Sequence, residues 1–201
     1  MNRTTARRSL EDHIARAITE VSAPGVLGAV VLLTIGWHST WPHVTGLIQG
    51  ALGATLCVAI PYVLVIRGVQ RGYWGDRHVS RREERLVPFT FTIASIILGL
   101  VAMFAIGADR TLLALIVSMF AGAILTFLAT LWWKVSLHAA VVAGCATVLT
   151  IVLGTPVLIV WMIVAVVCWS RVKLRDHTVA QVVVGAALGA ATAVLVFQLS
   201  A

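Results

Sequence analysis

Seven runs of apolar residues place the strongest limit on how this chain can fold. A run of about 18 or more apolar residues is long enough to cross the hydrocarbon core of a bilayer as a helix. Pro, Gly or charged residues separate the runs, as expected for connecting turns, and the runs cover approximately residues 23–41, 44–66, 88–108, 111–133, 137–153, 156–169 and 178–199. The pattern predicts an all-α, polytopic transmembrane bundle of about six to seven spanning helices, in which the short fifth and sixth runs form a tight hairpin.

The composition supports a membrane setting. The chain has 201 residues, of which 60% are hydrophobic and 11% charged, whereas a soluble domain is about half apolar and about a quarter charged. The surplus of apolar side chains exceeds what a core of this size can bury, so lipid must cover it. We expect residues 1–22 to form a cytoplasmic segment with a short amphipathic helix on the membrane surface, and residues 23–201 to form a single transmembrane domain.

The distribution of basic residues predicts the orientation of the bundle. The net charge is +7, and with the N-terminus inside and alternating spans, every Lys and Arg except Arg110 falls on the inner side. Basic residues in short loops mark the cytoplasmic side of a membrane protein. We therefore expect an integral protein of the plasma (inner) membrane with a cytoplasmic N-terminus and an external C-terminus, and we expect no nucleic-acid partner.

Three polar clusters lie on that inner side, at residues 76–85, 134–138 and 170–181. Each stands at the end of a predicted spanning helix, so a bundle brings them together around His138 and His177. Arginine binds phosphate oxygens with a planar fork of donors, and lysine adds a point charge. Histidine acts as a nucleophile or as an acid and base near neutral pH. The clusters predict a site for an anionic lipid head group, although basic loops that only orient the protein are the alternative.

The spacing of four residues resembles a known motif. Ser170 and Arg171, followed by His177 and Gln181, are similar to the third motif of the type 2 phosphatidic acid phosphatase (PAP2) superfamily, S-R-x5-H-x3-D. Ser136 and His138 resemble its second motif, P-S-G-H, and the basic loop 76–88 stands where its first motif, K-x6-R-P, would come. The resemblance covers roughly residues 67–199 and implies a PAP2-like fold.

The resemblance also implies a mechanism without metal or cofactor. In that family the third-motif histidine becomes a phosphohistidine, and the second-motif histidine protonates the leaving oxygen. By position, His177 would be the nucleophile and His138 the general acid, with Gln181 in place of the orienting aspartate. The implied phosphate ligands are Arg171, Ser136, Lys134, Arg77, Arg81, Arg82 and Arg85.

The chain also departs from the motifs. Gln181 accepts a hydrogen bond but brings no charge, Val135 and Leu137 replace the proline and glycine of the second motif, and Asp176 is expected on a helix with its side chain turned away. Three functions stay open. The first is a slow, metal-independent phosphatase of a lipid phosphate or polyprenyl (di)phosphate. The others are a non-catalytic anionic-lipid binder or transporter that kept the phosphate pocket, and a prenyl-diphosphate-processing membrane enzyme.

Small residues mark two further faces. Gly46, Gly50 and Ala54 follow one another at every fourth position, as do Gly185, Gly189 and Ala193. Such spacing predicts close helix packing within the bundle, with a homo-oligomer through the same faces as the alternative. Pro61 is expected to kink the second run.

Overall fold

The computed structural model describes residues 9–74, 86–154 and 158–200. This part of the chain is helical and contains no strands. Its elements are α1 (Leu10–Val21), α2 (Pro24–Ser39), α3 (His43–Ala54), the π-helix η1 (Thr55–Ala59), α4 (Ile60–Gln70), α5 (Leu86–Ala105), α6 (Arg110–Trp132), α7 (Leu137–Leu153), α8 (Val160–Lys173) and α9 (Val179–Ser200).

Four helices of the described chain are long and apolar enough to cross a membrane: residues His43–Gln70, α5, α6 and α9. The pair α1 and α2, bent by 46°, adds a fifth span if the two helices are counted together. The prediction of a membrane helix bundle is therefore confirmed in its coarse form. The count of six to seven spans stays a prediction, because α2, α7 and α8 have only 16, 17 and 14 residues.

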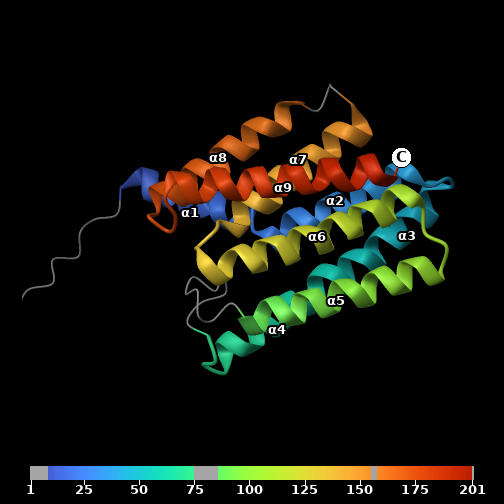
Figure 1. The fold of residues 1–201 in the computed structure, drawn as a ribbon, viewed down its shortest axis with the longest axis horizontal. Coiled ribbons are helices and arrows are strands. Elements are labelled where there is room, and N and C mark those ends of the chain that lie inside the picture. The colour runs from blue at the N-terminus through green and yellow to red at the C-terminus, as the bar shows by residue number, and fades with distance from the viewer. Residues whose placement is uncertain (1–8, 75–85, 155–157, 201) are drawn as a thin grey trace, which may run out of the picture.

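The helices run up and down, so their connections gather at two ends (Figure 1). One end holds α1 and the turns from α6 to α7 and from α8 to α9; the other holds the turns from α2 to α3 and from α5 to α6. We call the first the basic end, because it carries Arg16, Arg67, Arg71, Lys134, Arg171, Lys173 and Arg175. Of the Lys and Arg residues that the structure describes, only Arg110 lies at the opposite end.

Two apolar clusters hold the bundle together. The larger one joins α2, η1, α5, α6, α7 and α9, and its fully buried side chains include Leu32, Ile35 and Ile116. The smaller one lies between α7 and α8, with Ala143 and Val167 at its centre. The second cluster fixes α8, and with it Arg171, against α7.

Close backbone contacts explain the small-residue faces. A Cβ at Gly185 would lie 2.5 Å from the carbonyl oxygen of Ser136, and one at Gly189 would overlap the carbonyl oxygen of Ala140, so α9 meets α7 without side chains between them. Gly46 and Gly50 meet α2 in the same way. The prediction of close helix packing within the bundle therefore describes both faces, and the homo-oligomer stays an untested alternative.

The second run contains a π-helical turn, η1, which ends at Ala59, two residues before Pro61. The kink expected at Pro61 itself stays a prediction. Proline has no N–H, so it leaves a carbonyl of the preceding turn without its helical partner. The hydroxyl of Ser95 on α5 donates to the carbonyl oxygen of Leu56 within this turn. The π-helix turns Cys57 and Val58 toward a cavity in the centre of the bundle.

Candidate functional site

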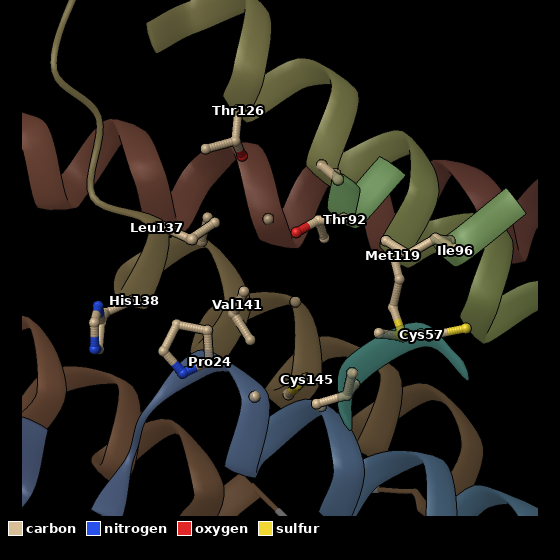
Figure 2. A pocket seen from close by; sticks show the side chains of 18 of the residues that line it. Pro24, Cys57, Thr92, Ile96, Met119, Thr126, Leu137, His138, Val141 and Cys145 are labelled. Atoms are coloured by element: carbon tan, nitrogen blue, oxygen red, sulfur yellow. The ribbon is translucent and has the colours of Figure 1, made fainter. Parts of the chain in front are cut away.

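A cavity of about 270 Å³ lies in the bundle and has one polar end. His138, Arg171 and His177 line it at the basic end, and apolar residues line most of the remainder. Figure 2 shows His138 beside Pro24 and Val141, with Cys57 and Met119 farther along. The structure thus brings together three of the predicted site residues, from α7, α8 and the turn before α9.

The turn after α8 folds the chain back onto the helix end. Arg175 adopts a left-handed conformation with φ of 57°. Its N–H donates to the carbonyl of Val172 at 2.9 Å, and the N–H of Asp176 donates to the carbonyl of Arg171 at 3.2 Å. This pair of bonds is the Schellman motif that closes many helices. The N–H of His177 donates to the same carbonyl at 3.3 Å, which places His177 beside Arg171.

Two hydrogen bonds meet on the side-chain oxygen of Gln181. Nδ1 of His177 lies 3.2 Å from Oε1, and the N–H of Thr178 donates to the same oxygen at 3.1 Å. An amide nitrogen cannot accept from a backbone N–H, so the Thr178 contact identifies the atom facing His177 as oxygen. Oxygen has no proton to give, so the proton lies on Nδ1 of His177. In the neutral ring the lone pair is then on Nε2.

Gln181 also caps α9. Its backbone N–H donates to Oγ1 of Thr178 at 3.3 Å while its side chain accepts from the Thr178 N–H. This reciprocal pair is a capping box, in which the first and fourth residues of a helix start satisfy each other. Gln181 therefore has a structural role as well as the orienting role that the motif implies.

Arg171 is buried, with only 4% of its surface exposed. Its Nη1 lies 3.1 Å from Oδ2 of Asp176 and donates to Oγ1 of Thr19 at 3.4 Å. The expectation that Asp176 lies on a helix was wrong. The left-handed residue Arg175 ends α8 before Asp176, and the turn carries the carboxylate back to the guanidinium.

The contribution of α1 was missed by the sequence analysis, which placed it only on the membrane surface. Thr19 is buried on α1, and its hydroxyl contacts both Arg171 and Oγ of Ser170, the latter at 3.3 Å. Glu11 and Lys173 form an ion pair nearer the start of α1, and this hydrogen bond raises the pKa of Lys173. Glu11, Ala15 and Thr19 recur every four residues, which was the available signal for a packing face.

Comparison with known proteins gives no relative: no family model, no curated protein and no solved structure matches this chain. The resemblance to the PAP2 superfamily rests on the motif residues of this chain alone.

Ser136 and Lys134 lie next to the site. Ser136 is fully buried at the N-cap of α7, where its Oγ accepts from the N–H of Ala139 at 3.3 Å. Its own N–H donates to the backbone carbonyl of Gln181 at 3.2 Å, which joins the starts of α7 and α9. Lys134 is partly exposed in the connection before α7. Phosphate binding by either residue stays a prediction.

The remaining predicted phosphate ligands, Arg77, Arg81, Arg82 and Arg85, lie outside the described residues. Within the described ranges, no group of three or more His, Cys, Asp or Glu side chains is placed to hold a metal ion.

Proposed function

We propose that this chain is a membrane phosphatase of a lipid phosphate or polyprenyl (di)phosphate, and a divergent member of the PAP2 superfamily. The observation that carries the proposal is the pair of hydrogen bonds on Oε1 of Gln181. A phosphohistidine mechanism needs a neutral imidazole with one nitrogen held as a donor and the other able to attack. The contact of His177 with Gln181 supports this assignment, because it places the proton on Nδ1 and the lone pair on Nε2.

The reaction would proceed in two steps. In the first, Nε2 of His177 attacks phosphorus, the bond from phosphorus to the ester or diphosphate oxygen breaks, and His138 gives its proton to the leaving oxygen. In the second, His138 takes a proton from water, whose oxygen attacks the phosphohistidine and releases phosphate. Both histidines line one cavity, which supports the separate roles proposed for them.

Arg171 is the proposed phosphate ligand. A guanidinium presents donors in a rigid fork that matches two phosphate oxygens. Thr19 and Asp176 both contact Nη1, so they hold the plane of the fork at the polar end of the cavity. The positive charge of the guanidinium favours an anionic head group over a neutral one.

A specific observation also favours the second candidate, a non-catalytic binder of anionic lipid. Gln181 lends His177 no negative charge, and its oxygen is shared with the Thr178 N–H of the capping box. Replacing the carboxylate of a serine-protease triad by an amide lowers kcat by about 10⁴, and the wrong histidine tautomer contributes to that loss. We therefore propose slow turnover, and binding without turnover is the outcome that favours this alternative.

The basic end is proposed to face the cytoplasm. The exclusive placement of Arg110 at the opposite end, among the described Lys and Arg residues, supports this orientation under the positive-inside rule. The phosphate site would then act on lipids of the inner leaflet.

The test uses the purified protein in nanodiscs with EDTA and a panel of lipid phosphates and polyprenyl phosphates. We expect wild type to release phosphate slowly and His177→Ala to lose turnover while still binding the lipid, because Arg171 remains. Acid-labile ³²P should be trapped on wild type and not on His177→Ala. His13→Ala, which removes an exposed histidine of α1, is the control.

Equal rates for wild type and His177→Ala would end the assignment of the nucleophile. Binding by both proteins without turnover by either would favour the lipid binder. Loss of activity in EDTA that returns with a divalent cation would contradict the metal-free mechanism.

A further inference from the structure

The cavity extends far beyond the groups that would hold a phosphate. Along α7 its lining runs from His138 to Val148, and along α6 from Thr126 to Leu115. These separations of ten and eleven residues correspond to about 15–17 Å along the helix axes. The cavity therefore reaches from the basic end toward the middle of the bundle.

The absence of a side chain at Gly122 opens part of this space. Gly28, Gly122 and Gly144 line the cavity from α2, α6 and α7. A Cβ at Gly122 would meet no heavy atom within 4 Å, unlike the glycines that allow helices to touch. Protein interiors are close-packed and contain few voids larger than a water molecule, and empty apolar voids stay dry. An apolar space of this length in a membrane bundle is suited to hydrocarbon.

We propose that this cavity holds one hydrocarbon chain of the lipid phosphate, and that Gly122 sets how deep the chain reaches. The proposal rests on the proposed function for the head-group end, because the chain would continue from a phosphate bound beside Arg171 and His177. An extended chain advances about 1.2 Å per bond, so the cavity accommodates about 13 carbons. A second chain, where the lipid has one, would remain in the bilayer.

Gly122 is placed where a side chain would limit how deep the hydrocarbon chain reaches. It lies four residues, or about 6 Å, below Thr126 on α6. Side chains on a helix lean toward its N-terminus, which for α6 is the end away from the phosphate site. A leucine at position 122 would fill the deeper part of the cavity and leave the polar end unchanged.

The experiment compares butyl phosphate with dodecyl phosphate, using the full-length protein in nanodiscs. Gly122→Leu should keep wild-type kcat/KM for butyl phosphate and lose at least about tenfold for dodecyl phosphate, since each buried methylene is worth about fourfold. Ala121→Leu is the matched control, because Ala121 lies outside the lining and one turn from the exposed Leu125. Membrane partitioning of each substrate is the same for all variants and cancels in the ratios.

A second, smaller substitution distinguishes a filled cavity from misfolding of Gly122→Leu. Gly122→Ala adds one methyl group and should lower kcat/KM for dodecyl phosphate by about threefold to fourfold. Equal losses on both substrates, or no loss on either, would overturn the proposal.

Binding of tritiated dodecyl phosphate separates this proposal from the phosphatase assignment. One outcome would be that no variant turns over either substrate, while Gly122→Leu binds dodecyl phosphate at least about tenfold more weakly than Ala121→Leu. That outcome would support the hydrocarbon-chain cavity and contradict the phosphatase function. Absence of dodecyl phosphate binding by wild type would overturn the chain cavity itself.

Discussion

Nη1 of Arg171 lies 3.1 Å from Oδ2 of Asp176, inside the turn that joins α8 to α9. The arginine side chain is 5% exposed and the aspartate side chain 35% exposed, so water reaches only the carboxylate. The donors of a guanidinium bind a carboxylate or a phosphate with the same geometry. Asp176 therefore holds the guanidinium in place, and under the proposed function it would also compete with an incoming phosphate.

Asp176→Asn should strengthen phosphate binding and weaken the ligand-free fold. Removal of the competing charge is expected to lower the Kd for a lipid phosphate about tenfold, since a hydrogen bond to a charged group contributes about 1.5–3 kcal/mol. Equilibrium binding and thermal unfolding in nanodiscs measure both effects. Asp109→Asn, at the start of α6, removes the same charge at the opposite end and should change neither. An unchanged Kd would show that Asp176 does not compete.

Gln181→Glu should raise the rate of turnover. Glutamate has the reach of glutamine, so its carboxylate would accept from both His177 and Thr178 and add the missing charge. The rise expected is about tenfold or more, given the effect of a triad carboxylate. Gln198→Glu, on an exposed turn near the other end of α9, supplies the control charge. A slower Gln181→Glu enzyme would mean that a neutral partner is required.

Thr19→Val should raise KM without changing kcat. The substitution removes the hydroxyl that contacts Arg171 and Ser170 and keeps the shape of the side chain. A lost hydrogen bond of about 1 kcal/mol corresponds to a KM about fivefold higher. Thr19→Ser should restore the wild-type value. A fall in kcat at constant KM would instead connect α1 to the chemical step.

Arg175→Gly should stabilise the protein. Arg175 has a φ of 57°, and a left-handed conformation costs a residue with a Cβ about 1 kcal/mol or more relative to glycine. The free energy of unfolding in mixed micelles should rise by about 1 kcal/mol. Val172→Gly, inside α8, should lower it by about the same amount. A loss of stability in Arg175→Gly would show that its side chain contributes more than the backbone conformation costs.

The proposed orientation predicts which introduced cysteines react in intact cells. Ile106 and Tyr73 are exposed at 50% and 69%, at the opposite end and the basic end of the bundle. A membrane-impermeant thiol reagent should label Ile106→Cys in intact cells and Tyr73→Cys only after lysis. The reverse pattern would place the basic end outside.

Local features made most helices predictable from the sequence. Ser136 and Gly154 bound α7, and the expected run 137–153 coincides with it. The contacts of Asp176 were not predictable, because the left-handed turn falls on an arginine, a residue that gives no signal for this conformation. Thr19 was missed because its contact with Arg171 depends on the 46° bend between α1 and α2. The cavity was not predictable, because its lining comes from several helices at once, which no single run reveals.

The bare contact between α7 and α9 has a consequence for how this site tolerates change. His138 begins one of these helices and His177 precedes the other, and the backbones touch at Gly185 and Gly189. Because the backbones are in contact at these two glycines, the packing of the two helices sets the spacing of His138 and His177. A single methyl group added at either glycine would push the two helices apart. Substitutions at Gly185 and Gly189 would therefore change the distance between His138 and His177 well before they unfolded the bundle.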